Sequence, residues 1–251
     1  CKGFDRGTSL YASGSTGTPR GVELTDADFC FSPYSGGNAM PAIAMKPNRG
    51  LLLFLPLAQV FARYMQFFCF AGNVSLGLSS NLKTILADFK AFKPTFILAV
   101  PRIFEKIYNA ASQKAGAGFK GRVFADATQT AYDWSHAQQS GGSIPLALNA
   151  KHALYNKLVY SSIMEVFGGH VEYAVSGGAP LDSSIAHFFN GVGLPLLEGY
   201  GMTETCAPSS VNPTEGYKIG TIGLPLPGVT LGVDEEGGLC IKSPAVCAGY
   251  H

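Results

Sequence analysis

The sequence predicts an α/β protein made of mostly parallel sheets with packed helices, followed by a short β-rich segment at the C-terminus. The first observation is a set of short aliphatic runs without polar interruption, which is typical of strands buried on both faces. The second is that longer segments with helical spacing of apolar residues separate these runs. Such alternation favours a parallel sheet with crossover helices. Beyond Tyr217, short apolar runs punctuated by glycine and proline replace the pattern.

The first half of the chain contains three candidate strands with helices between them. Two of the strands are continuous apolar runs, each followed by a proline, and we expect them to be buried. Thr25 is a candidate N-cap for the first helix. The expected strands are 9–12, 51–55 and 95–100, and the expected helices follow Thr25, span 58–70, run from a cap at Asn81 to Pro94, and span 103–115.

The second half begins with two long helical patterns, 122–139 and 146–167, for which we expect a purely structural role. The alternation then resumes with a strand at 171–175, a helix at 181–189 and a strand at 194–197. The runs 230–233 and 239–242 flank an acidic turn and predict a β-hairpin. We therefore divide the chain into a central α/β part, 1–216, and a β-rich segment, 217–251.

Composition excludes several classes of protein. The 251 residues are 47% hydrophobic and 14% charged, well below the roughly 25% charged residues of an average domain, so much of the surface is expected to be apolar or covered. A net charge of +1 argues against binding nucleic acid. The six cysteines form no C-x-x-C pair and are expected to be mostly buried, reduced residues of a cytoplasmic protein. No uncharged apolar run reaches the ~18 residues of a membrane span.

The segment Tyr11–Val22, YASGSTGTPRGV, concentrates glycines and hydroxyls and adds one cation, Arg20. Glycine allows backbone N–H groups to turn toward a ligand, and such amides bind phosphate oxygens together with hydroxyls and a guanidinium. The segment is not a Walker A motif, because that motif requires a Lys followed by Ser or Thr. For this segment alone, a flexible turn is the alternative.

Two further segments, 176–180 and 198–204, follow candidate strands as glycine-rich loops. Ligands of open parallel sheets bind outside the carboxyl ends of the strands, so we expect these three segments to form a mononucleotide site. Residues 177–179 offer bare backbone to a flat base, and Tyr200 offers a stacking ring. Thr203 offers a phosphate donor and Glu204 an oxygen ligand for Mg²⁺.

These motifs resemble those of the adenylate-forming superfamily, which includes acyl-CoA synthetases, adenylation domains and luciferases. YASGSTGTPRGV resembles its phosphate loop, and EGYGMTET resembles its Y-G-x-T-E motif. FLPLAQVFARYMQ, FKPTFILAVPRIFEKIYNAA and YAVSGGAPL are similar to segments of long-chain fatty acid–CoA ligases, in particular the bacterial branch. The resemblance covers nearly the whole chain from Leu10 onward.

The resemblance implies a reaction and a set of site residues. A long-chain fatty acid would attack the α-phosphorus of ATP, with Mg²⁺, and the thiol of CoA would then displace AMP from the acyl-adenylate. The implied phosphate-binding residues are Ser13, Gly14, Ser15, Thr16, Gly17 and Arg20, and the implied adenine-pocket residues are Gly177, Gly178 and Ala179, with Glu198, Gly199, Tyr200 and Gly201 on the other side. Thr203 would meet the α-phosphate, Glu204 would bind Mg²⁺, and both would be catalytic together with Arg20. A fatty acid tunnel is implied near Phe61, Val100 and Gly201.

The chain departs from the family pattern at several positions. Arg20 stands where the family has Lys, and its larger fork fits phosphate differently. Gln59 stands where these ligases usually carry a His near the acyl carboxylate, and it cannot carry a charge. Ala12 and Ser15 replace threonines. The family also has a long preceding segment and a small C-terminal domain bearing a Lys needed for adenylation, so we expect these residues to be the central part of a ligase.

Alternatives remain open. A fatty acyl-AMP ligase would stop at the adenylate or pass it to a carrier protein, and a non-catalytic module would only bind nucleotide or lipid. A P-loop phosphotransferase lacks its Lys-Ser/Thr pair here. No general base is required, and we expect solvated or structural roles for all five histidines. Peripheral membrane contact is also expected, since fatty acids partition into bilayers.

Overall fold

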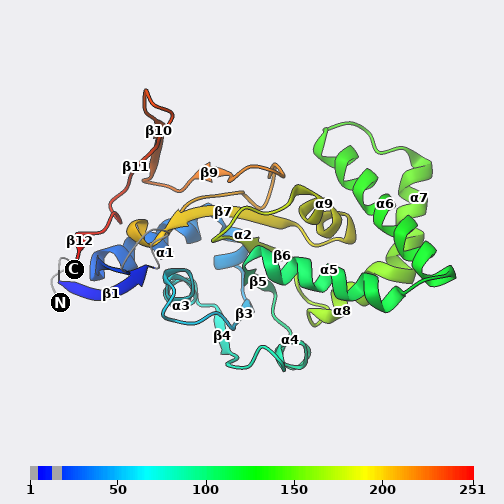
Figure 1. The fold of residues 1–251 in the computed structure, drawn as a ribbon, viewed down its shortest axis with the longest axis horizontal. Coiled ribbons are helices and arrows are strands. Elements are labelled where there is room, and N and C mark those ends of the chain that lie inside the picture. The colour runs from blue at the N-terminus through cyan, green and yellow to red at the C-terminus, as the bar shows by residue number, and fades with distance from the viewer. Residues whose placement is uncertain (1–4, 13–18) are drawn as a thin grey trace.

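A seven-stranded sheet forms the centre of the computed structural model, which describes residues 5–12 and 19–251 (Figure 1). Its strand order is β4-β3-β5-β6-β7-β8-β9, in which the first five strands are parallel and the last two are antiparallel to their neighbours. The α/β prediction is therefore confirmed. The strands are β3 (Gly50–Leu53), β4 (Ser75–Leu78), β5 (Phe96–Ala99), β6 (Tyr173–Ser176), β7 (Leu196–Met202), β8 (Ala207–Val211) and β9 (Leu224–Pro225).

Helices cover both faces of this sheet, which explains the uninterrupted apolar runs. Side chains alternate between faces along a strand, so Leu52 and Ile97 enter one core with Phe104 and Phe189, while Leu51 and Leu98 enter the other. Every residue of β3 and β5 is consequently buried. The helices around the sheet are α1 (Asp26–Ala39), α2 (Pro41–Ala44), α3 (Val60–Ala71), α4 (Ile85–Phe92), α5 (Pro101–Ala115) and α9 (Ser183–Val192).

Local sequence signals predict the start of one helix correctly and the start of another wrongly. Thr25 caps α1 in a reciprocal box: its hydroxyl accepts from the Asp28 amide at 3.3 Å, and its own amide donates to Asp28 Oδ2 at 2.7 Å. The prediction that Asn81 caps the next helix is wrong, because α4 begins only at Ile85. The Asn81 side chain instead accepts from the Lys83 amide at 2.9 Å and stabilises a preceding turn.

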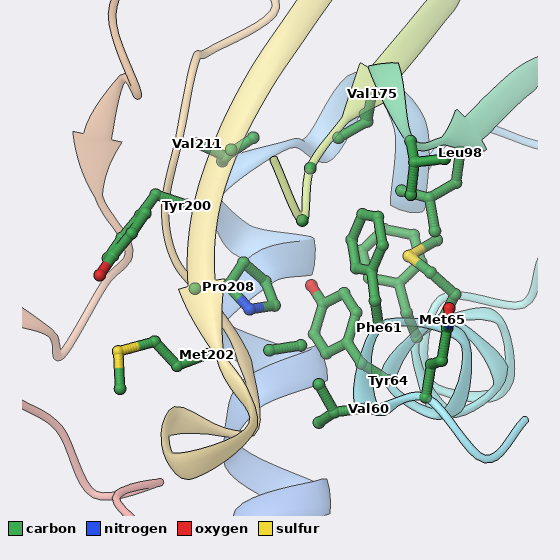
Figure 2. A pocket seen from close by; sticks show the side chains of 18 of the residues that line it. Val60, Phe61, Tyr64, Met65, Leu98, Val175, Tyr200, Met202, Pro208 and Val211 are labelled. Carbon is green, nitrogen blue, oxygen red and sulfur yellow. The ribbon is translucent and has the colours of Figure 1, made fainter. Parts of the chain in front are cut away.

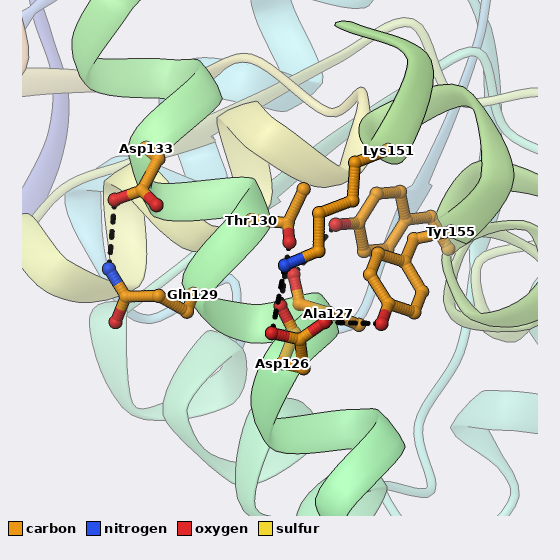
Figure 3. Close-up of polar contacts among 8 residues, drawn as sticks. Asp126, Ala127, Gln129, Thr130, Asp133, Lys151 and Tyr155 are labelled. Carbon is orange, nitrogen blue, oxygen red and sulfur yellow. Dashed lines mark hydrogen bonds and ion pairs between the residues drawn. The ribbon is translucent and has the colours of Figure 1, made fainter. Parts of the chain in front are cut away.

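A long helical hairpin, α6 (Phe119–Gln139) and α7 (Leu146–Tyr155), lies at one end of the molecule (Figure 1). A π-helical turn, η1 (Asn156–Tyr160), joins α7 to α8 (Ser161–Val166), so the predicted helix at 146–167 contains a local widening. Figure 3 shows how the two arms are connected: Asp126 of α6 accepts from Lys151 at 2.8 Å and from the Tyr155 hydroxyl.

A second, antiparallel sheet lies at the opposite end of the molecule, in the order β1 (Arg6–Ala12), β2 (Arg20–Thr25) and β12 (Gly249–Tyr250) (Figure 1). The predicted hairpin is also present, as β10 (Thr230–Val233) and β11 (Leu239–Lys242). Residues beyond 216 thus pair with the central sheet through β9 and with β2 through β12. The division of the chain at residue 216 stays a prediction.

Two expectations about the surface can be compared with the described residues. Cys69 and Cys206 are buried as expected, whereas Cys30 and Cys240 are exposed, so the expectation of mostly buried cysteines is only partly correct. Cys30 lies on an outward position of α1 and Cys240 in the exposed β10–β11 hairpin. Within 5–12 and 19–251, no helix combines the length and apolarity needed to cross a membrane.

Candidate functional site

A cavity of about 420 Å³ opens where β5, β6 and β7 end, between α3 and the antiparallel pair β7–β8 (Figure 2). Val100 directly follows β5 and Gly177 directly follows β6, so both lie at the carboxyl edge of the parallel strands. The predicted site residues that line the cavity are Gln59, Phe61, Val100, Gly177, Gly178, Gly199, Tyr200, Gly201 and Thr203. The fold therefore brings four segments that are far apart in the sequence to one place.

Apolar side chains form one wall of this cavity. Phe61 of α3 lies against Gly177, where an added Cβ would meet the ring at 3.2 Å, and Val100 lies beside Gly178. Gly178 has a positive φ of 83°, a conformation that favours glycine. Tyr64, Met65 and further apolar residues complete the wall. Of the α3 residues in this wall, the sequence analysis identified only Phe61, and it missed Tyr64 and Met65. The signal available was that apolar residues surround this helix rather than form a stripe, which indicates cover on several sides.

The segment 198–202 was predicted to be a loop, and that prediction is wrong. It continues β7 and pairs with β8, with Gly199 opposite Val211 and Gly201 opposite Pro208. A Cβ on Gly201 would lie 1.8 Å from the carbonyl oxygen of Ala207, so the two strands can approach only because this residue is glycine. Figure 2 shows Tyr200 and Met202 projecting from β7 to the side opposite Phe61 and Tyr64.

Two of the predicted adenine-pocket residues do not line the cavity. Glu198 is only partly buried, and its Oε1 accepts from the Leu181 amide at 3.1 Å, so its carboxylate stabilises the segment before α9. Burial raises the pKa of Glu198, although the Leu181 amide opposes this effect. Ala179 is exposed beyond the cavity rim.

Arg20 and Glu204 lie outside the cavity but are brought together by Tyr250 of β12. The Tyr250 hydroxyl donates to Glu204 Oε1 at 3.0 Å, and the guanidinium carbon of Arg20 lies 5.6 Å from the centre of the Tyr250 ring. The Glu204 carbonyl also accepts from the Cys247 amide at 2.7 Å. Hydrogen bonding to Glu204 raises the pKa of Tyr250. Sequence reasoning did not identify Tyr250, because only the pairing of β12 with β2 places it here.

Two further predictions concern the phosphate side of the site. Ser13, Gly14, Ser15, Thr16 and Gly17 lie outside the described residues. In the part of the chain that is described, no group of three His, Cys, Asp or Glu residues could hold a metal ion. Mg²⁺ commonly keeps several waters and binds through one or two carboxylates plus substrate phosphates. The partly buried carboxylate of Glu204, which has one oxygen bonded to Tyr250, is compatible with that manner of binding.

An apolar cavity at the carboxyl edge of parallel strands, bordered by glycine-rich backbone, defines a ligand-binding α/β protein. The chain belongs to the family described as "AMP-binding enzyme", whose sequence profile matches residues 5–251. It is 42% identical over 246 residues to the long-chain-fatty-acid–CoA ligase FadD15 of Mycobacterium tuberculosis, covering 98% of this chain and 41% of that protein. It is 30% identical to long chain acyl-CoA synthetase 3 of Arabidopsis thaliana, covering 97% of this chain and 39% of that protein.

Solved structures show the same fold. The o-succinylbenzoate CoA synthetase of Bacillus subtilis, in complex with its acyl-adenylate intermediate, superposes with a TM-score of 0.66 at 19% identity, covering 97% of this chain and 41% of that one. The N-terminal domain of FACL13 from Mycobacterium tuberculosis superposes with a TM-score of 0.68 at 19% identity, covering 100% and 53%. The chain thus spans about two fifths of the length of the curated relatives given above.

Proposed function

We propose that this chain carries the adenylate-forming site of an ATP-dependent long-chain fatty acid–CoA ligase. The observation that carries the proposal is the cavity itself. An apolar wall from α3 and the end of β5 lies on one side, and glycine-rich backbone after β6 and Tyr200 of β7 lie on the other. An acyl-adenylate has the same two parts, an alkyl chain and a nucleotide. Membership of the AMP-binding family and similarity to fatty acid–CoA ligases support the assignment.

The nucleotide part is assigned to the β6 and β7 side. Gly177 and Gly178 would face the adenine with bare backbone, Ala179 would border it at the exposed rim, and Tyr200 would stack on it. The partial exposure of Tyr200 and its projection away from the apolar wall support this role (Figure 2). Glu198, Gly199 and Gly201 would act through the backbone of β7, since the Glu198 carboxylate is already bonded to Leu181.

The acyl part is assigned to the apolar wall. Phe61 and Val100 would contact the alkyl chain, whose transfer from water to apolar surroundings is favourable. Gln59, just before α3, lines the cavity and would donate a hydrogen bond to the acyl carboxylate. Because Gln is uncharged, this contact would orient the carboxylate without neutralising it, and the carboxylate would keep its nucleophilic charge.

The phosphate part is assigned to the rim where Thr203, Arg20 and Glu204 lie, together with residues 13–17. Thr203 would donate its hydroxyl to the α-phosphate, and Arg20 would offset charge on phosphate oxygens. Glu204 would hold Mg²⁺, which when bound neutralises charge that develops on the phosphates. The chain's own contribution is then to align carboxylate and phosphate, which requires no general base. CoA as acyl acceptor and a peripheral membrane contact belong to the same proposal.

The experiment is a calorimetric titration of the full-length protein with Mg·ATP and with a non-hydrolysable oleoyl-adenylate analogue. Tyr200→Ala should weaken binding of both ligands by about tenfold, the loss of a stacking contact worth ~1.4 kcal/mol. Tyr34→Ala is the matched control, since Tyr34 is an exposed tyrosine of α1 that does not line the cavity, and it should change neither. Phe61→Ala should weaken only the oleoyl analogue. Failure of the wild type to bind the analogue would refute the proposal.

A further inference from the structure

The turn that carries Thr203 and Glu204 ends in two adjacent residues with a left-handed conformation. Cys206 has a φ of 53° and a ψ of 49°, and Ala207 has a φ of 78°. Residues with a Cβ rarely adopt this conformation, which normally favours glycine. In the described part of the chain, no other two adjacent non-glycine residues have a positive φ. Such strain persists only where the surrounding structure holds it, and it is concentrated at functional sites.

A buried hydroxyl of α1 holds the peptide group between these two residues. Ser32 Oγ donates to the Cys206 carbonyl oxygen at 2.9 Å. Because the peptide group is planar, the direction of this carbonyl is set by ψ of Cys206 and φ of Ala207. The bond from Ser32 therefore fixes torsions of both strained residues at once. All three residues are buried, so water does not compete for the carbonyl.

Other hydrogen bonds of the turn lie within it. Thr205 Oγ1 accepts from the Met202 amide at 3.1 Å and lies 3.1 Å from the Ala207 carbonyl oxygen, to which it can donate. The Cys206 amide donates to the Thr203 carbonyl at 3.1 Å. These bonds define the shape of the turn, whereas the bond from α1 connects it to a separate element.

We propose that Ser32 is a positioning residue for Thr203 and Glu204. It holds the left-handed turn in place, and the turn directs Thr203 to the cavity and Glu204 to the rim beside Tyr250. Without the hydroxyl, the strained torsions relax and both side chains move. Ser32 does not line the cavity, so it acts only through the backbone of the turn. The inference rests on the proposed function, which assigns these two side chains to the α-phosphate and Mg²⁺.

The helix α1 also supplies a matched control, Ser35, which lies three residues after Ser32. Ser35 Oγ donates to the Pro227 carbonyl oxygen at 2.6 Å, and Ser35 is as buried as Ser32. Ser32→Ala and Ser35→Ala thus remove the same atom from the same helix, and each breaks a bond to a backbone carbonyl. Urea denaturation should show a similar loss of stability for the two variants. Only Ser32→Ala should affect the reaction.

The experiment measures the fatty-acid-dependent exchange of pyrophosphate into ATP by the full-length protein. Ser32→Ala should lower the exchange rate by about tenfold to a hundredfold, since a small misplacement of reacting groups is costly. The Mg²⁺ concentration that gives half the maximal rate should rise by about tenfold, because the support of the Glu204 ligand is lost. A smaller folded fraction would lower the rate but would leave that concentration unchanged. Ser35→Ala should match wild type in both measurements.

A glycine at the strained position provides a second test. Glycine adopts a positive φ without strain, so the double variant Ser32→Ala, Ala207→Gly should regain most of the rate that Ser32→Ala loses. The inference would be overturned if Ser32→Ala behaved like Ser35→Ala in rate and Mg²⁺ dependence. A double variant no faster than Ser32→Ala would also overturn it.

Hydrogen exchange separates a failure of this inference from a failure of the proposed function. A wild-type protein that exchanges no pyrophosphate with any fatty acid would contradict the proposed function. The peptide 198–211 still reports on the turn, because the Cys206 amide is bonded within it. Ser32→Ala should speed hydrogen exchange in this peptide by about tenfold relative to Ser35→Ala. Equal exchange in the two variants would overturn the role of Ser32.

Discussion

Two fully buried tyrosines provide a test of how polar groups affect the stability of this fold. Tyr64 of α3 is 1% exposed, and its hydroxyl has no hydrogen-bond partner among the described residues. It packs tightly against Gly36 of α1, where a Cβ could not fit. Tyr160 is 0% exposed, but its hydroxyl donates to the Ala127 carbonyl at 2.7 Å. Burial raises the pKa of both tyrosines, so both hydroxyls remain protonated and neutral.

The same substitution should therefore have opposite effects at the two sites. Leaving a buried donor unpaired costs roughly 1–3 kcal/mol. Tyr64→Phe removes that cost and should raise the free energy of unfolding by about 1 kcal/mol, allowing for the small void it leaves. Tyr160→Phe removes a formed hydrogen bond and should lower the free energy of unfolding by about 1–2 kcal/mol. For a protein of this size, 1 kcal/mol corresponds to a shift of roughly 2–4 °C in Tm.

The assay is urea denaturation of the full-length protein, comparing midpoints at equal slopes so that a midpoint change reports stability. Each phenylalanine variant serves as the control for the other, because both lose the same atom from a buried ring. A Tyr64→Phe variant destabilised as much as Tyr160→Phe would refute the reasoning, because it would mean that the Tyr64 hydroxyl has a partner such as a bound water.

Two further predictions follow from contacts around the sheet. The buried Arg49 guanidinium bonds to both Glu172 oxygens, at 2.6 and 2.9 Å, and holds the pKa of Glu172 below its usual 4.5. The stability this pair provides is thus present above pH 4.5 and lost as pH falls through the lowered pKa. Glu172→Gln should lower the free energy of unfolding at pH 7 by only ~1 kcal/mol, since water screens the half-exposed carboxylate, and should flatten the acid limb of stability against pH. Gly201→Ala forces a Cβ to 1.8 Å from the Ala207 oxygen and should lower the melting temperature by an amount equivalent to about 3 kcal/mol. The control Gly232→Ala, where an added Cβ has no atom within 4 Å, should leave the melting temperature unchanged. Equal melting temperatures for the two variants would contradict the close approach of β7 and β8.

The central strands were predictable because they are buried on both faces. Every residue of β3 and β5 must then be apolar, and such a run is visible in the sequence without knowledge of its neighbours. The start of α1 was predictable for a similar reason, since Thr25 and Asp28 satisfy each other's amides within four residues. Structural features that depend only on neighbouring residues can thus be predicted from the sequence.

The rest depended on partners distant in the sequence. The segment 198–202 contains two glycines and resembles a loop, and it becomes a strand only because β8 supplies hydrogen bonds. β8 itself contains Pro208 and two serines, a composition that does not predict a strand. Tyr250 reaches Glu204 only through the β12–β2 pairing. The sequence therefore predicted individual site residues, but it did not predict how the fold arranges them relative to one another.

The short ladder between β12 and β2 also has a consequence for how the molecule is made. It pairs Gly249 with Glu23 and Tyr250 with Val22, so two residues close a loop that contains almost the whole chain. Closing a long loop costs entropy before any contact repays it, and contacts of large sequence separation form slowly. During synthesis, the central sheet has all its strands before Tyr250 emerges from the ribosome. The corner that gathers Arg20 and Glu204 thus assembles only after the seven strands have been made, and a nascent chain released before Gly249 would retain the seven strands without it.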